Sequence, residues 1–452
     1  MGKLRRDVHL HVRGTGHKWA VLATAVAGVS QSQWVGQAQA DALHMLGSCK
    51  AFPTASVFNT PVNDLPLHDY SATLVDVITS AGSHVKADWG STWIDPYLHN
   101  AKEKIGIPIN VVPSKQPLVS VTLAPGWGTA ESDGVVRGTH TAKYPFPSNA
   151  LIEDPPGGDA HVLVVREGEC VLYEVWEGKY SSTTGWKANN GAIFNLSSTA
   201  MRPEYWTSAD AAGLPIAPLL LQYDEVYSTD EEIGHAMRFT APSGYILGAT
   251  WPATHRTEYE TANGCATVTT KYAGATYDHC PAMGQRFRLS ADFNETLMCF
   301  SAGGNLCETR DYSSCDCTQT FPSDLQKILR AMKKYGLILA DGGDAWYVTG
   351  AYDTRWDNSQ LHMLNYVWAG WFEAVNVSSI IVSPTSYATT YTGVDTPPSA
   401  TPRPSTKTPT RHPTKVPTKH PTKHPTKLPT KHPTKLPTKH PTKHPTSLKG
   451  TG

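Results

Sequence analysis

The chain has 452 residues, and its 39 Lys/Arg balance its 39 Asp/Glu, but the charges are unevenly distributed. Residues 1–40 hold five basic side chains and one acid, residues 401–452 hold twelve basic side chains and no acid, and the 360 residues between them hold 22 basic and 38 acidic side chains. A hydrophobic content of 40% excludes a fully disordered chain, and the acidic body argues against nucleic acid as a partner, because phosphate binding needs concentrated Lys/Arg.

The N-terminus has the order of a secretory signal peptide. Basic side chains from Lys3 to Lys18 precede the apolar stretch 19–29, and the small-x-small triplet 38–40 follows. We therefore expect residues 1–40 to be an export signal, with an amphipathic N-terminal helix or a retained anchor as the alternatives. No apolar run reaches the roughly 18–20 residues of a membrane-spanning helix. The expected protein is secreted, extracellular or associated with the cell wall, and it has no membrane anchor.

Residues 41–382 are expected to form one globular domain in which short strands dominate. Apolar and β-branched runs predict strands at 118–123, 161–165, 171–176, 192–196, 235–240, 245–251, 286–289, 337–340, 346–349 and 372–377. Helices are expected at 71–81, 215–226, 323–335 and 357–366, with Ser323 and Asp357 as caps and Gly336 ending the third helix. Many short strands with few helices predict a β-rich α+β fold, with a sandwich- or barrel-like core and a few peripheral helices.

Residues 161–174 give the clearest candidate for a catalytic pair of side chains. Arg166-Glu167-Gly168-Glu169 reads as a tight turn, and counting outwards from it places His161 opposite Glu174 on one face of a hairpin. A carboxylate raises the pKa of a neighbouring His and orients its ring, which suits an acid/base pair. The alternatives are a cross-strand pair on a solvated face, and a small metal site that also includes Asp159.

A second group of acids lies at Asp224 and Glu225, and a further acidic run at 230–232 reads as solvated surface. Glycoside hydrolysis needs two carboxyl groups, one acting as an acid and the other as a base or nucleophile. Adjacent side chains cannot both point into one cleft from a regular strand. We therefore expect one of Asp224 and Glu225 to work together with Glu174 or Asp210.

Aromatic and basic side chains complete the predicted substrate site. Trp and Tyr faces stack on the apolar faces of sugar rings, and Arg or His holds a carboxylate or sulfate if the substrate is acidic. The aromatic candidates are Trp206, Trp251, Trp346, Tyr347 and Trp356, of which about two are expected in a groove and the others in the core. The basic candidates are Arg238, His255 and Arg355.

All eight cysteines follow the leader, and their even number in an exported chain predicts disulfides. Six of them fall within 265–317, so the simplest pairing is local there and leaves Cys49 for Cys170. This disulfide-stapled stretch reads as an insertion into the scaffold. The alternative, a metal site at 315–317, lacks a second ligand pair at zinc-finger spacing. Three sequons, beginning at Asn195, Asn294 and Asn376, are possible glycan sites.

The C-terminus is a low-complexity tail. Residues 383–407 are rich in Ser, Thr and Pro and predict a linker, and residues 408–447 repeat an X-Pro-Thr-Lys pattern ten times. A Pro every fourth residue forbids helix and sheet and favours polyproline II. The basic array is expected either to bind an acidic wall or matrix polysaccharide through many weak contacts, or to act as an inert spacer.

Three stretches resemble a family of exported bacterial and microbial eukaryotic proteins to which no activity is attached. They are GDAHVLVVREGECVLYEVWEG (158–178), GAIFNLSSTAMRPEYWTSADAAGLPIAPLLLQYDEV (191–226) and LRAMKKYGLILADGGDAWYVTGAYDTRWD (329–357). The resemblance covers about residues 49–377, and the tail and the Cys-rich insert lie outside it. It implies one exported domain and nothing about mechanism.

These features lead to the hypothesis of a secreted, polysaccharide-cleaving enzyme of the glycoside hydrolase type, tethered by its tail. Glu174 with Asp224 or Glu225 would supply acid and base, and His161 would tune them. The expected sugar-binding side chains are Trp206, Trp346 and Trp356, helped by Asp210, Arg238, His255, Tyr347 and Arg355. No metal or other cofactor is expected, and the oligomeric state stays open. The alternative is a non-catalytic glycan-binding or structural protein of the cell wall or matrix.

Overall fold

The structure is a computed structural model that describes residues 44–94, 102–153, 158–227, 231–256, 265 and 279–393. The chain divides into two units, residues 1–398 and 399–452, and every described residue belongs to the first. The predicted leader and the repeat tail therefore lie outside the described residues. Within the described part, no helix combines the length and the apolar character needed to cross a membrane.

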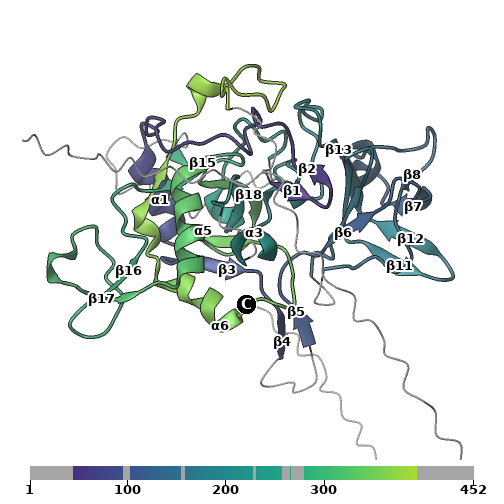
Figure 1. Cartoon of the computed structure of the whole chain (residues 1–452). Coiled ribbons are helices and arrows are strands. Elements are labelled where there is room, and N and C mark those ends of the chain that lie inside the picture. Colours follow the sequence, from purple (N-terminus) through teal and green to yellow (C-terminus); the bar gives the residue numbers. More distant parts are fainter. Residues whose placement is uncertain are drawn as a thin grey trace, which may run out of the picture. The chain divides into compact units, whose positions relative to one another are not determined.

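A six-stranded mixed sheet forms the centre of the domain (Figure 1). Its order is β20 (Phe372–Ala374), β15 (Arg286–Leu289), β18 (Leu337–Gly342), β14 (Met237–Ala241), β19 (Tyr347–Thr349) and β3 (Lys86–Asp88). Strands β14 and β18 are buried along most of their length, as expected of central strands that are covered on both faces. Strand β3 is at one edge of the sheet, and Asp88 is its last residue.

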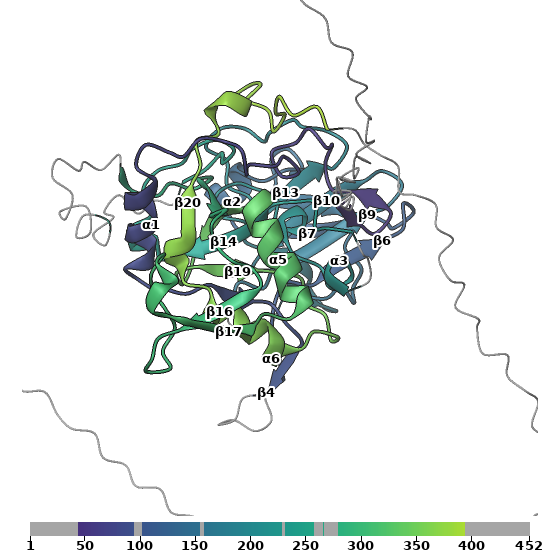
Figure 2. The same ribbon diagram turned by 60° about the vertical axis from the view of Figure 1, so that its left-hand side comes forward.

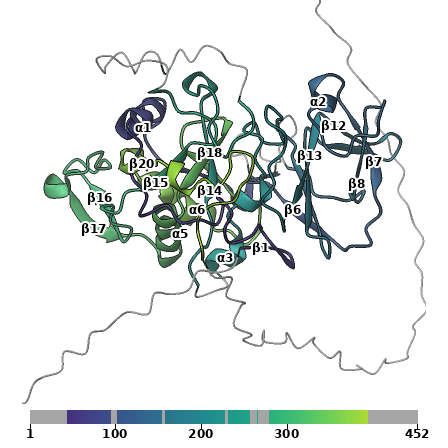
Figure 3. The same cartoon turned by 90° about the horizontal axis from the view of Figure 1, so that it is seen from above.

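Two four-stranded sheets pack face to face as a β-sandwich (Figure 3). One has the order β13 (Asn190–Asn195), β10 (Val171–Trp176), β9 (Val162–Arg166) and β6 (Ile109–Val112). The other has the order β11 (Lys179–Ser181), β12 (Gly185–Ala188), β7 (Val119–Leu123) and β8 (Thr141–Tyr144). Alternate side chains of β9 and β10 face opposite cores, because Val162 and Val164 join the sandwich core while Leu163 and Leu172 join the main core.

The predicted β-rich α+β class with a sandwich-like core is confirmed. Helices α1 (Ser71–Thr79) and α5 (Ser323–Lys334) lie against β20 and β15 at the periphery (Figure 2). Helix α5 buries the apolar face that the sequence predicts and ends at Gly336, whose φ of +69° suits glycine. Ser323 does not cap it, because its hydroxyl binds Asp324 instead. Asp357 does cap α6 (Asn358–Leu361), through the backbone N–H groups of Ser359 and Gln360.

Two predicted elements differ in the structure. The predicted helix 215–226 is instead a 3-10 turn (Ala217–Leu219) and a short helix α3 (Tyr223–Tyr227). The predicted strand 245–251 is a turn (Ser243–Tyr245) with one isolated bridge at Ala249, since Gly248, at φ +77°, interrupts it. Residues 383–393, predicted as linker, belong to the fold, because Tyr387 is fully buried against Phe58.

Four disulfides join the eight cysteines, and Cys49 pairs with Cys170 as the sequence predicts. Their number is compatible with an extracellular protein. Cys299–Cys317 and Cys307–Cys315 staple the hairpin of β16 (Leu297–Phe300) and β17 (Asp316–Thr320). Two further hairpins are β1 (Met45–Leu46) with β2 (Cys49–Lys50), and β4 (Thr92–Ile94) with β5 (Lys102–Lys104).

Candidate active site

A row of polar side chains crosses one face of the central sheet. The register pairs Phe239 of β14 with Val348 of β19, so Arg238 lies beside Thr349, and Thr349 in turn pairs with Asp88 of β3. Residues that pair across neighbouring strands point to the same face. Arg238, Thr349 and Asp88 therefore share that face, while Phe239 and Val348 point into the apolar core.

A β-bulge adds Asp341 to this row. Between Phe239 and Thr240 the pairing of β14 with β18 shifts by one residue, so that Thr240 faces Asp341 rather than Ala340. A shift by one residue exchanges the side chain that points to a given face. The bulge therefore brings a carboxylate onto the polar face, as bulges do beside many active sites.

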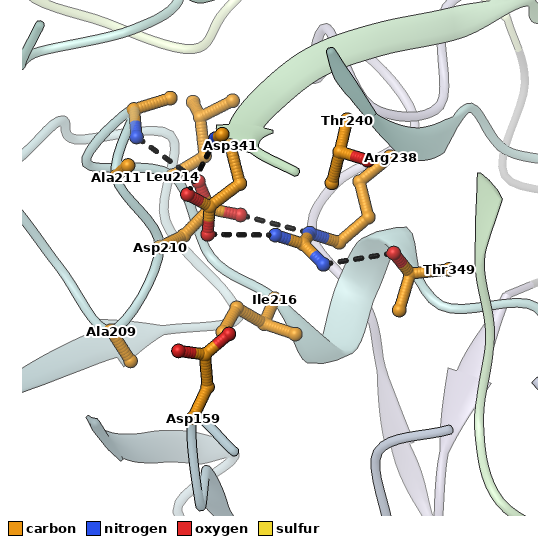
Figure 4. Close-up of polar contacts among 12 residues, drawn as sticks. Asp159, Ala209, Asp210, Ala211, Leu214, Ile216, Arg238, Thr240, Asp341 and Thr349 are labelled. Atoms are coloured by element: carbon orange, nitrogen blue, oxygen red, sulfur yellow. Dashed lines mark hydrogen bonds and ion pairs between the residues drawn. The ribbon is translucent and has the colours of Figure 1, made fainter. Parts of the chain in front are cut away.

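Arg238 is fixed by hydrogen bonds to three side chains (Figure 4). Its Nε donates to Asp210 Oδ2 at 2.9 Å, one terminal nitrogen donates to Thr349 Oγ1 at 2.9 Å, and the other donates to Asp341 Oδ2 at 3.2 Å. Burial disfavours the charge of Arg238, but Asp210 and Asp341 outweigh this effect and raise its pKa. Because Asp210 and Arg238 are both buried, this group supports the cleft floor and offers Arg238 little freedom to hold a substrate anion.

His161 pairs with a carboxylate that the sequence did not single out. Its Nδ1 lies 2.5 Å from Glu153 Oε2, and its Nε2 lies 3.0 Å from the carbonyl oxygen of Ala209. Burial lowers the pKa of His161, but Glu153 has the larger combined effect and raises it to about 9. A protonated ring can donate from both nitrogens, which both of these acceptors require.

The predicted pairing of His161 with Glu174 is wrong. Strand β10 pairs Glu174 with Leu163, and residues 167–170 all belong to the turn, so the register is displaced by two residues. Glu174 is fully buried, and its carboxylate accepts hydrogen bonds from the backbone N–H groups of Ile216 and Ala217 at 2.9–3.0 Å. Burial raises the pKa of Glu174 to about 7, although these bonds favour its charged form. Its contacts give it a structural role at the start of the 3-10 turn.

A cavity of about 270 Å³ lies over the polar row. Five carboxylic acids line it: Asp88, Glu153, Asp159, Asp341 and Asp344. His161, Arg238 and Tyr347 also line it. A second cavity, of about 590 Å³, shares Asp159, Asp341 and Gly342 with the first, so the two cavities adjoin and are together called the cleft.

Asp159 lies at the junction of the two cavities. Its carbonyl oxygen accepts a hydrogen bond from Glu177 N at 2.9 Å, which fixes the 158–160 segment beside the end of β10. Its exposed carboxylate accepts a hydrogen bond from Trp176 Nε1 at 3.0 Å. Figure 4 shows this carboxylate pointing towards the group formed by Asp210, Asp341 and Arg238.

An aromatic shelf borders the larger cavity. Trp127, in helix α2 (Trp127–Ala130), stacks on Trp176 with ring centroids 6.2 Å apart and an angle of 28° between the planes. The Trp127 side chain is 48% exposed, which is unusual for so large an apolar group. Asn190 lines the same cavity with a buried Oδ1 that has no hydrogen-bond partner in the described part of the chain. The shelf therefore offers an apolar face beside one polar atom, Asn190 Oδ1, that has no partner among the described residues.

Asp88 differs from the other acids of the cleft. Burial raises its pKa to about 6, and the neighbouring Glu153, Asp159 and Asp344 contribute to the rise, while Arg238 opposes it. In Glu153 the bonds to His161 outweigh burial and lower the pKa. The cleft thus holds carboxyl groups in clearly different environments, which is the arrangement that separates an acid from a base.

The structure distributes the other predicted residues over several places. His255 and Tyr347 line the cleft, whereas Trp346 and Trp356 are buried in the core. Trp206 is half-buried, with its ring 5.5 Å from the guanidinium carbon of Arg202.

The acids predicted at 224 and 225 do not line the cleft. Asp224 is exposed on α3 and pairs with Arg355 at 2.7 Å. Glu225 contacts His44 and His235 instead. Neither lies among the residues of the two cavities described above.

Asp88, Glu153, Trp127, Trp176 and Asp341 are not among the residues that the sequence singles out. The signal that was available for Asp341 is an Asp-Gly-Gly-Asp turn directly after a buried strand. No comparable local signal marks Asp88 or Trp127. Comparison with family models, curated proteins and solved structures gives no match, so the resemblance to an exported family stays a prediction.

Proposed function

We propose that the protein is an exported glycoside hydrolase that cleaves a polysaccharide in the cleft between Asp88 and Asp159. The observation that carries this proposal is a raised-pKa carboxyl group and a solvent-exposed carboxyl group on the same cleft, beside an exposed Trp shelf. Glycosidic cleavage needs two carboxyl groups with separate roles and a surface that holds sugar rings.

In this mechanism Asp88 is the general acid. Its pKa of about 6 keeps a substantial protonated fraction in mildly acidic solution, so it can protonate the leaving oxygen. Asp159, which is exposed and oriented by Trp176, is the base or the nucleophile. Asp341 and Arg238 line the cleft between them and are hydrogen-bonded to each other.

The charge of the cleft supports a proposal for the class of sugar. Glu153 is paired with His161, and Asp341 shares Arg238 with Asp210, so Asp159 and Asp344 add negative charge that these cations do not offset, even with Asp88 protonated. A polyanionic segment would be repelled, and we therefore propose a neutral or amino-bearing polysaccharide as the substrate. An acidic polysaccharide is instead the proposed partner of the basic tail, which would tether the enzyme to a wall or matrix.

The test measures new reducing ends after the full chain is incubated with neutral, amino-bearing and acidic polysaccharides. Asp88→Asn and Asp159→Asn are each expected to lower kcat by at least about 100-fold, the usual contribution of a positioned acid or base. Asp64→Asn is the matched control, because this carboxyl group is exposed and lies outside both cavities. Loss of activity in Asp224→Asn, with none in the two cleft variants, would move the active site to α3.

A non-catalytic glycan-binding protein is the second candidate, and the Trp127–Trp176 shelf favours it, because stacking alone binds sugars without cleavage. In that case no member of the panel would yield reducing ends. Glycan retention would survive Asp88→Asn and would be lost in Trp127→Ala.

A further inference from the structure

Outside the cleft, three metal-ligating side chains meet where the N-terminal hairpin contacts α3. His44 precedes β1, Glu225 lies within α3, and His235 precedes β14. One ligand atom from each residue lies within 4.8 Å of the other two. Both His side chains are buried, and the Glu225 side chain is 12% exposed. Three segments that are distant in sequence supply this cluster, so the fold brings it together.

The hydrogen bond of His235 to Ala236 shows which of its ring nitrogens carries the proton and which directs a lone pair towards Glu225. Its Nδ1 lies 2.7 Å from the carbonyl oxygen of Ala236, which can only accept, so Nδ1 carries the proton. In the neutral ring Nε2 is then an acceptor, yet it lies 3.3 Å from one Glu225 carboxylate oxygen and 3.4 Å from the other. Two acceptors at this distance repel each other unless a cation lies between them, either a proton or a metal ion.

His44 meets the same carboxylate. Its Nδ1 contacts Glu225 Oε1, and its ring stacks on that of His235 with centroids 3.7 Å apart and an angle of 23° between the planes. Two protonated rings in this buried stack would repel each other strongly. A single divalent ion would instead bind one nitrogen of each ring and one oxygen of the Glu225 carboxylate, and its charge would balance that of the carboxylate.

We propose that His44, Glu225 and His235 form a binding site for a divalent transition-metal ion, with Zn²⁺ the best-fitting ion. Two imidazole nitrogens and one carboxylate oxygen are ligands that Zn²⁺ prefers, and a water molecule can complete four-coordination.

The surroundings of the ligands match those of metal ligands in proteins. The bond of His235 Nδ1 to the Ala236 carbonyl is the support that a metal-ligating His normally has. The bond from Gln222 N to Glu225 Oε2, at 2.9 Å, orients the carboxylate in the same way. The bound ion would tie the hairpin at 45–50 to α3 and to His235, which lies three residues before Arg238.

The test uses the full chain, dialysed against EDTA, then loaded with Zn²⁺ and freed of excess metal by gel filtration. We expect the wild type to retain one equivalent of zinc more than either Glu225→Gln or His235→Gln. The control is His362→Gln, since His362 is exposed and lies outside the cluster. The repeat at 408–447 contains six further His residues, so the difference between chains with the same repeat is the measured quantity.

A second measurement follows the thermal stability of the wild type and of Glu225→Gln. Zinc at a hundredfold excess over its dissociation constant should raise the melting temperature of the wild type by about 4 °C, given the entropy of unfolding of roughly 350 folded residues. Far-UV circular dichroism checks that Glu225→Gln folds, and in this variant the shift should be absent. Equal zinc content in the wild type and both cluster variants would overturn the proposal, leaving a His235–Glu225 ion pair only.

Discussion

Replacing Arg238 with Met tests the ion pair beneath the cleft. The guanidinium is buried and makes one bond of 2.9 Å to Asp210, which is itself fully buried. Removing one partner of a buried pair leaves an uncompensated charge and costs about 3–5 kcal/mol. Since native domains are stable by only about 5–15 kcal/mol, this loss would be a large part of the total. Unfolding in guanidinium chloride, monitored by Trp fluorescence, would measure the loss in the free energy of unfolding.

The dependence of this loss on pH identifies its source. Burial already raises the pKa of Asp210 in the wild type, and removal of Arg238 would raise it further. A carboxyl group whose pKa is raised in the folded state binds a proton that the unfolded chain loses above about pH 4. Wild type and variant lose stability equally while Asp210 is protonated in both folded proteins, and the variant alone continues to lose it between the folded-state pKa of the wild type and its own higher pKa. Arg238→Met should therefore lose less stability relative to the wild type at pH 5 than at pH 8.

A second substitution provides the control. Adding Asp210→Asn to Arg238→Met removes the buried charge and should recover most of the stability lost at pH 8, with little further change at pH 5. If the loss is the same at both pH values, or if the two substitutions are simply additive, the buried Asp210 carboxylate is not the cause and the reasoning fails.

Three further predictions concern separate features. Because burial raises the pKa of Asp88 to about 6, kcat of the proposed hydrolase should fall as the pH rises through about 6, and a pH profile without that descending limb would contradict the role of Asp88 as acid. Glu174→Ala leaves the N–H groups of Ile216 and Ala217 unpaired in the core and should lower the free energy of unfolding by about 3 kcal/mol, measured by guanidinium unfolding with Glu169→Ala as an exposed control. Removing Cys49–Cys170, which spans 121 residues, should cost about 5 kcal/mol by the chain-entropy relation, and an unchanged unfolding midpoint in the double Ser variant would refute this.

The sequence defined the elements with strong local signals. Helix α5 is predicted to within one residue of its observed end, because four apolar side chains recur at helical spacing and Gly336 follows. The strands β10 and β15 are predicted with their observed bounds. In these segments the local preference agrees with the tertiary environment.

The hairpin register shows where local reasoning stops. Both a two-residue turn and the observed four-residue turn place His161 and Glu174 on the same face, because a displacement by two residues preserves the alternation. The longer turn contains Cys170, which is bound to Cys49 and adopts a φ of +51°. That constraint comes from a residue 121 positions away, and no pattern within 161–174 could reveal it.

The candidate site was harder to predict than the fold. Trp346 and Trp127 both occur beside polar or small residues in the sequence, yet one is fully buried and the other is half exposed. Their difference depends on which elements cover them. Asp341 reaches the cleft only because a bulge shifts the pairing of two strands that are about a hundred residues apart.

The link between Cys49 and Cys170 has a consequence for limited proteolysis. It closes a covalent ring that contains β3, β6, β7 and β9. A protease that cuts once anywhere between residues 50 and 169 would nick the ring without releasing a fragment, and the two pieces would separate only after the disulfide is reduced. A single cut in this quarter of the chain would therefore be visible on a reducing gel and invisible on a non-reducing one.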